Sequence, residues 1–148
     1  MALYFTNQKK TSRNKAEEGV DYFATPEPLG FKMVEWAGIR PGERVLEPSG
    51  GHGAIARFFP DSTTRHAVEP SYELAGRLAL NAPDTRVHQV QFEDYDIINK
   101  FDAIVMNPPF GTAGKTAMDH LEKAVRHLKD GGRVVALIPN GSSMAKRF

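Results

Sequence analysis

Residues 44–53 read RVLEPSGGHG, a short apolar run that ends on an acid and passes into a cluster of glycines. Residues 44–47 predict a short buried strand, and the glycines favour a tight turn that approaches a ligand closely. We predict a helix over residues 54–59 directly after the turn. A strand, a glycine loop and a helix in this order are typical of a parallel α/β sheet whose ligand lies beyond the carboxyl ends of the strands.

Helices and strands alternate on both sides of this loop. Before it, Thr25 and Pro26 have the chemistry of a helix start and Gly38 that of a helix end. We therefore predict a helix over residues 26–37. After the loop, a helix is predicted at residues 72–81. Strands are predicted at residues 66–69, 86–92, 101–106 and 133–138.

An amphipathic helix is expected between the last two of these strands. Apolar side chains recur there at helical spacing, and the sequence Asp-Gly-Gly at residues 130–132 predicts a stop. The members of this apolar stripe are Met118, Leu121, Val125 and Leu128. Strands that alternate with helices of this length imply right-handed crossovers and a sheet covered on both faces. The sequence therefore predicts an α/β fold with a Rossmann-like, doubly wound and mostly parallel sheet.

The bulk properties of the chain limit its organisation. With 148 residues and 41% apolar composition it can close one hydrophobic core, which we place at residues 21–148. Residues 1–20 carry several Lys and Arg among Thr, Ser and Asn, and they predict a flexible basic arm. The net charge of +1 gives no overall attraction for a polyanion, so any nucleic-acid contact must be local.

Composition also excludes several classes of protein. The chain has no Cys, which excludes disulfides and thiolate metal sites, and its five His lack metal-ligand spacing, so no metal is expected. No apolar run approaches the roughly 20 residues that span a bilayer, and the N-terminus lacks the apolar centre of a signal peptide. We therefore expect a cytoplasmic protein without a membrane partner.

Two acids end the first two strands at the edge where a ligand would bind. Glu47 precedes the glycines and a helix start, which favours an anionic ligand group. Glu69 ends the second strand, where a carboxylate can accept both hydroxyls of a ribose. Residues 51–56 also fit the permissive G-x-G-x-x-G/A pattern. A nicotinamide dinucleotide and a simple tight turn therefore stay open as alternatives.

Asn107-Pro108-Pro109-Phe110 follows the fourth strand and is the most specific motif of the chain. Two prolines stiffen the backbone and remove two N–H donors, which leaves the carbonyls and the Asn side chain to accept hydrogen bonds. This geometry suits an NH2 group. Residues 111–116 end like a phosphate loop, but Pro109 stands where its first glycine is required, which disfavours a nucleotide triphosphatase.

With these motifs, residues 22–139 resemble the amino-methyltransferases of the class I S-adenosylmethionine fold. The order of a cofactor motif before N-P-P-[YF] resembles the DNA adenine-N6 enzymes in particular. The resemblance implies S-adenosyl-L-methionine as the cofactor, with its methionine part against residues 23–26 and the glycine motif, and its ribose on Glu69. The residues it assigns to the cofactor are Phe23, Thr25, Glu47, Ser49, Gly51, Gly53, Glu69, Gln91, Phe92 and Asp94.

The chain departs from the resembled family at the adenine of the cofactor. The family usually has an Asp followed by an aromatic residue after the third strand, whereas this sequence has Gln91 and Phe92 there. A Gln amide can still accept a hydrogen bond from the adenine amine, and Phe92 can cover the ring. Asp94 is the second candidate for this contact.

The chemistry of an exocyclic amine explains the N-P-P-F motif. The lone pair of an adenine amine is delocalised into the ring, so the amine attacks poorly. The Asn107 side-chain oxygen and the Pro108 carbonyl would orient both hydrogens, beside the rigid Pro109. Phe110 would stack on a base that is flipped out of its helix.

The leading interpretation is methyl transfer to adenine N6 in DNA, which makes nucleic acid the expected partner. Several alternatives stay open, because other planar NH2 groups make similar demands. They are cytosine N4, guanine N2 or adenine N6 in RNA, a protein glutamine, and a non-catalytic cofactor-binding module.

The resembled fold continues past the fifth strand with two more strands and, in DNA enzymes, a target-recognition region. The predicted core here lacks those two strands. We expect the remainder of a longer chain or a partner subunit to supply target recognition. The fifth strand is apolar on both faces and would otherwise leave an exposed sheet edge.

Overall fold

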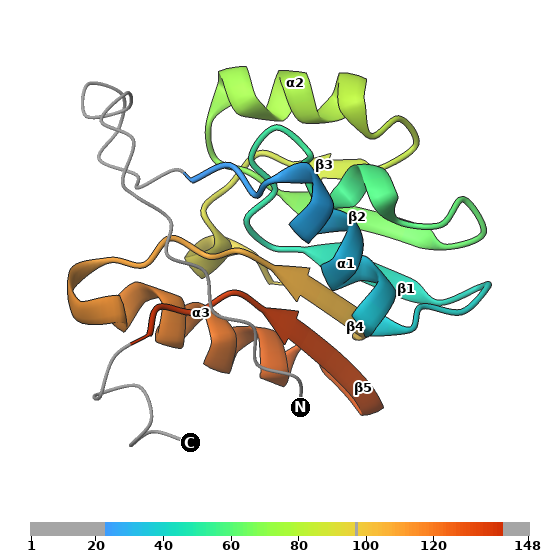
Figure 1. Ribbon diagram of the computed structural model, residues 1–148. Helices are drawn as coiled ribbons and strands as arrows, with labels where there is room; N and C mark the ends of the chain where they lie inside the picture. The colour runs from blue at the N-terminus through green and yellow to red at the C-terminus, as the bar shows by residue number, and fades with distance from the viewer. Residues whose placement is uncertain (1–22, 97, 141–148) are drawn as a thin grey trace.

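The computed structural model describes residues 23–96 and 98–140, and the expected arm at residues 1–20 lies outside them. Five strands form one parallel sheet in the order β3-β2-β1-β4-β5 (Figure 1). Their bounds are β1 Arg44–Glu47, β2 Thr64–Val68, β3 Arg86–His88, β4 Phe101–Met106 and β5 Leu128–Ala136. The strand order reverses between β1 and β4, and open α/β sheets bind ligands at such a switch point. The predicted Rossmann-like fold is confirmed.

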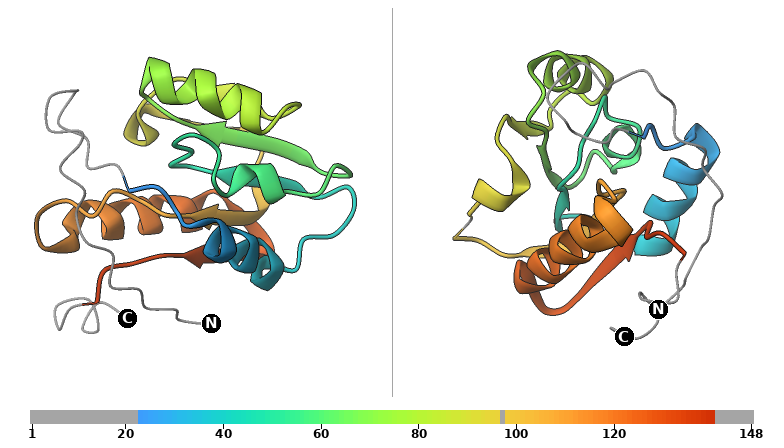
Figure 2. Two further views of the ribbon diagram at one scale, coloured as in Figure 1. Left: turned by 45° about the horizontal axis from the view of Figure 1, so that its top comes forward. Right: turned by 90° about the vertical axis from the view of Figure 1, so that its left-hand side faces the viewer.

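Three α-helices and three short 3-10 helices accompany this sheet in the described ranges. They are α1 Glu27–Ala37, α2 Tyr72–Asn81, α3 Lys115–Arg126, η2 Ala56–Phe58, η3 Phe92–Asp94 and η4 Thr112–Gly114. One face of the sheet packs against α1, η2 and α2, and the other packs against α3 and η3. Figure 2 shows α1 and α3 on opposite sides of the sheet. None of these helices combines the length and apolarity needed to cross a bilayer.

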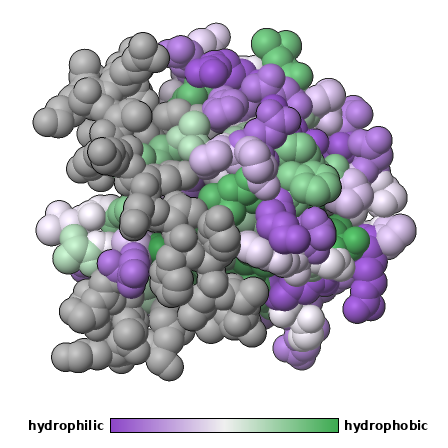
Figure 3. Space-filling model, viewed as in Figure 1, coloured by the Kyte–Doolittle hydropathy of each residue, from purple (hydrophilic) through white to green (hydrophobic). Residues whose placement is uncertain are grey.

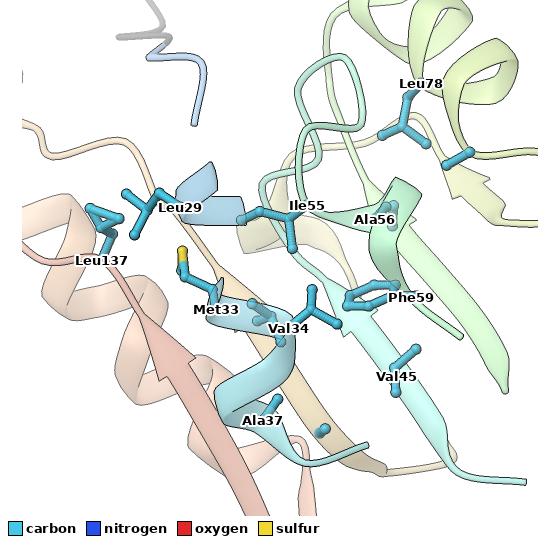
Figure 4. Packing of buried hydrophobic residues seen from close by; sticks show 14 residues of the cluster. Leu29, Met33, Val34, Ala37, Val45, Ile55, Ala56, Phe59, Leu78 and Leu137 are labelled. Atoms are coloured by element: carbon cyan, nitrogen blue, oxygen red, sulfur yellow. The ribbon is translucent and has the colours of Figure 1, made fainter. Parts of the chain in front are cut away.

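The alternation of side chains along β1 produces a core on each face of the sheet. Val45 and Leu46 are both completely buried, and neighbouring residues of a strand point to opposite faces. Val45 shares a core cluster with Met33 and Val34 of α1 (Figure 4). Leu46 belongs to the second cluster, together with Met118 of α3. Because β1 is packed on both of its faces, it holds the start of the glycine loop in a fixed position.

The helix predicted over residues 54–59 is too long, because η2 alone forms there. Phe59 is extended, with φ −63° and ψ 133°, directly before Pro60. A residue that precedes proline is sterically disfavoured in the α region, which ends the helix after one turn.

The third strand is shorter than predicted, because its partner ends. β3 pairs with β2 only as far as Val68 and His88, and β2 stops at Val68. The chain then leaves the sheet, so Phe92 lies in η3 instead of a strand. The strand predicted over residues 86–92 is therefore wrong in its second half.

The last strand begins earlier than predicted, because Leu128 belongs to β5 and not to a helix. Leu128 pairs with Phe101 of β4, and the register then shifts. Gly131 has φ 76°, so the Asp-Gly-Gly sequence forms a bulge inside β5 where a helix stop was predicted. Val125, predicted in the apolar stripe, is 55% exposed.

Arg133 of β5 anchors the end of α1. Its Nε donates to the Ala37 carbonyl at 2.5 Å and its Nη2 donates to the Gly38 carbonyl at 2.7 Å. Both terminal nitrogens also bind the Glu43 carboxylate, at 2.8 and 2.5 Å. The hydrogen bonds from Arg133 lower the pKa of Glu43 to about 2. These hydrogen bonds hold the C-terminal end of α1 in place. The N-terminal end of α1 directly follows a segment that reaches the candidate functional site.

The exposed apolar side chains are dispersed over several elements. Among the described residues, the large ones are Phe31, Tyr72, Leu80, Val90, Ile98 and Val125. On the face shown in Figure 3, the hydrophobic residues form separate areas among hydrophilic ones. Scattered apolar residues of this kind are normal on protein surfaces and do not by themselves indicate a docking site.

Candidate functional site

A pocket lies at the carboxyl ends of β1, β2 and β4, at the switch point of the sheet. It brings together predicted site residues that are widely separated in the sequence. These are Phe23, Thr25, Glu47, Ser49, Gly51, Glu69, Gln91, Phe92, Asn107, Pro108 and Pro109. Three predicted residues, Gly53, Asp94 and Phe110, do not line it. The sequence analysis also missed His120, which does.

The loop after β1 is shaped by glycine conformations and short backbone hydrogen bonds. Gly51 and Gly53 have φ 54° and 95°, in the left-handed region that side chains rarely adopt. The Gly50 N–H donates to the Val68 carbonyl at 2.7 Å, and a Cβ on Gly50 would overlap the Leu78 side chain. The Gly53 N–H donates to the Gly50 carbonyl at 2.9 Å. Gly53 therefore shapes the loop without lining the pocket.

Two buried acids hold this loop in place. One Glu47 oxygen accepts from the Ala56 N–H at 2.8 Å. The two Glu69 oxygens accept from the Gly51 N–H at 3.0 Å and from the Ser71 N–H at 2.6 Å. Only 2% of Glu47 and 6% of Glu69 are exposed. The glycine loop, η2 and the start of α2 thus share one hydrogen-bonded framework.

Burial raises the pKa of Glu47 well above its usual range. The Ala56 N–H opposes this rise, and the negative charge of Glu69 adds to it. A carboxyl group in this environment ionises more readily when a cation comes beside it. Glu47 therefore fits the ammonium group of a bound amino-acid moiety.

Ser49 gives a second sign of a ligand at this end of the pocket. Its hydroxyl oxygen is buried and has no hydrogen-bond partner in the part of the chain that the structure describes. A buried hydroxyl without a partner costs free energy, which a ligand would recover. Ser49 and Glu47 together fit the polar end of an amino acid.

Asn107 follows β4, and the segment before α1 fixes its orientation. Its Nδ2 donates to the Phe23 carbonyl at 3.1 Å and to the Thr25 hydroxyl oxygen at 3.0 Å. A carbonyl oxygen can only accept, so the nitrogen must face Phe23 and the side-chain oxygen must face the other way. Among residues 23–96 and 98–140, no hydrogen-bond partner is found for that oxygen. The Asn107 oxygen can therefore accept a hydrogen bond from a ligand.

Phe110 lies beside the pocket, against the same segment. Its ring stacks on that of Phe23, with centroids 5.9 Å apart and planes 23° apart. One face of Phe110 is therefore covered by the protein. Its stacking on a target base stays a prediction, now limited to the other face or to a rearranged Phe23.

The placement of the residues after β3 separates the two candidates for the adenine contact. Gln91 and the buried Phe92 line the pocket, whereas Asp94 at the end of η3 is exposed and does not. This placement favours Gln91 over Asp94. His120 of α3 also lines the pocket, and its ring meets Phe92 edge to face with centroids 5.2 Å apart.

The feature of the sequence that could have identified His120 was its position within the apolar stripe of a helix. Residues Ala117, Leu121 and Ala124 form the buried side of α3, and His120 lies among them with 5% exposure. A polar residue at helical spacing within an apolar stripe needs a partner, but spacing alone does not say which partner.

The segment that resembles a phosphate loop does not contribute to the pocket. Lys115 pairs with Asp119 one turn along α3, with Nζ and Oδ2 2.7 Å apart. Neither residue lines the pocket. The position of this segment therefore gives no support to the nucleotide triphosphatase alternative.

Comparison with known proteins agrees with this geometry. Residues 41–146 match the model of the family described as "Methyltransferase small domain". The chain belongs to this family. Class I methyltransferases of this kind use S-adenosyl-L-methionine.

Curated relatives of this methyltransferase domain include two tRNA-modifying enzymes. It is 29% identical over 106 residues to the tRNA (guanine(10)-N2)-dimethyltransferase of Methanothermobacter thermautotrophicus, covering 66% of this chain and 31% of that protein. It is 30% identical over 97 residues to the tRNA1(Val) (adenine(37)-N6)-methyltransferase of Pasteurella multocida, covering 57% of this chain and 41% of that protein. The chain thus spans less than half the length of either relative.

Solved structures share the fold of this methyltransferase domain. TrmN from Thermus thermophilus is 25% identical with a TM-score of 0.61, over 76% of this chain and 38% of that one. A type I restriction-modification methyltransferase subunit from Streptococcus thermophilus is 20% identical with a TM-score of 0.64, over 76% of this chain and 33% of that one. At 20% identity the second likeness shows the fold alone.

Proposed function

We propose that this chain binds S-adenosyl-L-methionine in the pocket and holds the exocyclic amine of an RNA base at Asn107 for methyl transfer. The orientation of Asn107 carries the proposal. Its nitrogen is committed to Phe23 and Thr25, so its oxygen is the atom offered to a ligand. Together with the Pro108 carbonyl, this oxygen provides two acceptors for the two hydrogens of a planar NH2 group.

The chain contributes alignment and electrostatics to the reaction. When bound, the cofactor supplies an electrophilic methyl group on a positively charged sulfur. Glu47 and Ser49 would hold its amino-acid end, and Glu69 would accept from its ribose while still holding the loop. Asn107 and Pro108 would turn the amine so that its lone pair faces the methyl group. As the N–C bond forms, the S–C bond would break and the cofactor would leave as neutral S-adenosylhomocysteine. The methylated nitrogen would carry the positive charge and then lose one proton to water, so this scheme needs no side-chain base before transfer.

The relatives favour RNA over DNA as the substrate. Both curated relatives are named as tRNA methyltransferases, one for guanine N2 and one for adenine N6. Each of these atoms is an exocyclic amine of the kind that the Asn107 motif suits. Adenine in DNA, the leading interpretation from the sequence, has no support from these relatives. We therefore place RNA first and test DNA beside it.

Labelled methyl transfer to tRNA, ribosomal RNA, DNA and protein in parallel tests the proposal. We expect label in RNA, and we expect Asn107→Ala to lose it. Asn99→Ala is the matched control, because Asn99 is exposed and does not line the pocket. Label in DNA alone would contradict the RNA assignment. Tight cofactor binding without transfer to any substrate would indicate a cofactor-binding module instead.

A further inference from the structure

His120 is a buried histidine that uses only one of its two ring nitrogens within the described residues. Its Nε2 lies 2.6 Å from Oε1 of Glu93. Its Nδ1 is buried and has no hydrogen-bond partner in residues 23–96 and 98–140. The residue as a whole is 5% exposed and lines the pocket. An unsatisfied nitrogen on a residue in the wall of a ligand pocket calls for a partner from the ligand.

Glu93 determines which nitrogen of His120 carries the proton. Burial alone would raise the pKa of Glu93, but the hydrogen bond with His120, followed by a backbone hydrogen bond and the nearby positive charges, outweighs it and lowers the pKa. Glu93 is therefore a carboxylate at neutral pH and can only accept. In the neutral ring, Nε2 then carries the hydrogen and Nδ1 carries a lone pair. The two nitrogens of an imidazole point in nearly opposite directions, so Nδ1 faces away from Glu93.

The surroundings of His120 indicate which part of a ligand it would meet. Its ring packs edge to face on Phe92, at 5.2 Å and 73°. Phe92 and Gln91 line the same pocket as His120, and the adenine of the cofactor is proposed to lie against them. The amino group of adenine donates hydrogen bonds, and the lone pair on Nδ1 of His120 can accept one.

We propose that His120 accepts a hydrogen bond from the amino group of the cofactor's adenine, with Glu93 as the positioning residue that fixes its tautomer. The inference rests on the proposed cofactor. It also accounts for the departure at Gln91, where related enzymes usually carry an Asp. His120 supplies the acceptor from α3, a different element of the fold, in place of that carboxylate.

Calorimetric titration with two ligands tests the proposal. One ligand is S-adenosylhomocysteine, and the other is its analogue in which purine without the amino group replaces adenine. The unmodified chain should bind the first about tenfold more tightly, as expected for one buried hydrogen bond. His120→Phe, which keeps an aromatic ring against Phe92, should bind both ligands with the weaker affinity.

Two further variants separate hydrogen bonding from packing. His120→Asn places a side-chain oxygen near the position of Nδ1 and should keep part of the preference. His127→Phe is the matched control, because the His127 ring also lies near Phe92, at 6.2 Å, but does not line the pocket. It should keep the full preference.

Glu93→Gln tests the positioning role separately. A Gln amide can donate as well as accept, so it no longer selects one tautomer. Nitrogen NMR should show one tautomer of His120 in the unmodified chain and a mixture in the variant. The ligand preference should fall about threefold without a comparable change in melting temperature.

The outcomes distinguish this inference from the function on which it rests. If His120→Phe keeps the tenfold preference, or if the unmodified chain shows none, the role of His120 is overturned while the cofactor assignment stands. If the unmodified chain binds neither ligand, the cofactor assignment fails and this inference fails with it.

Discussion

The two halves of the pocket are built differently. In the half proposed to hold the cofactor (the cofactor half), around Glu47, Gly51 and Glu69, the acids bind backbone N–H groups and are part of the buried fold. In the half proposed to hold the target amine (the amine half), Asn107 is only partly buried and is oriented by two hydrogen bonds to the segment before α1. Substitutions in the first half should therefore change binding and stability together. Substitutions in the second should change the chemistry and leave cofactor binding intact.

The largest effect is expected for Gly51→Val in the cofactor half. Gly51 has φ 54°, a conformation that costs an ordinary side chain about 1–2 kcal/mol and a branched one more. The added side chain would also occupy volume that the ligand needs. We expect cofactor affinity to fall by at least about a hundredfold in calorimetric titration.

Gly76→Val is the control for this substitution. Gly76 lies on an exposed position of α2, where a Cβ meets no atom within 4 Å. This variant should bind cofactor normally. Normal binding by Gly51→Val would remove the glycine loop from the proposed site.

Asn107→Ala should have the next largest effect, on the reaction rate alone. Loss of one aligned acceptor costs about 3 kcal/mol, or about a hundredfold in rate. Cofactor affinity should stay within about twofold, because Asn107 belongs to the amine half. Transfer kinetics and calorimetry on the same preparation measure both. An equal loss of cofactor affinity would show that the two halves are not independent.

Glu47→Gln should weaken cofactor binding by about tenfold, because it removes the charge that meets the ligand's ammonium group. It should also stabilise the ligand-free protein. The pKa of Glu47 is raised in the folded state, so the fold holds this proton more tightly than the unfolded chain does. Its contribution to stability therefore falls as pH rises above 4.5, the ordinary pKa of a Glu side chain.

Thermal melting across pH measures this second effect. The melting temperatures of Glu47→Gln and the unmodified protein should agree near about pH 4 and diverge above about pH 5, with the variant higher. A variant that is less stable at neutral pH would show that the ionised carboxylate is needed by the fold itself.

Thr25→Val should have the smallest effect. It removes one of the two acceptors that orient Asn107 and leaves the Phe23 carbonyl in place. We expect the transfer rate to fall about fivefold, as for one neutral hydrogen bond. Thr85→Val is the matched control, because the Thr85 hydroxyl has no partner in the described part of the chain. A Thr25→Val enzyme with an unchanged rate would mean that Phe23 alone orients Asn107.

Local signals predicted some elements well and others poorly. The strands at residues 44–47 and 101–106 and the helix at residues 72–81 are confirmed, because periodicity and flanking breakers define them locally. The end of β3 depends on where β2 stops, which no local pattern contains. Leu128 continues a helical spacing, yet pairing with Phe101 places it in β5.

The sequence likewise predicted some residues of the candidate site and missed others. Motifs at the strand ends pointed to Glu47, Glu69 and Asn107, because parallel strands bring their carboxyl ends to one edge. The orientation of Asn107 could not be predicted, since its partner Phe23 lies 84 residues away in the sequence. His120 was missed because a histidine in an apolar stripe resembles a core residue until its unpartnered nitrogen is located.

Digestion of methylated RNA to nucleosides identifies the atom that receives the methyl group. Two acceptors at Asn107 and Pro108 match the two hydrogens of an exocyclic amine and match no ring carbon or ribose hydroxyl. We therefore predict that the product is N2-methylguanosine or N6-methyladenosine, and that Asn107→Ala forms neither at a comparable rate. A methyl group found on a ribose oxygen or on a ring carbon, with Asn107→Ala fully active, would contradict the proposed function.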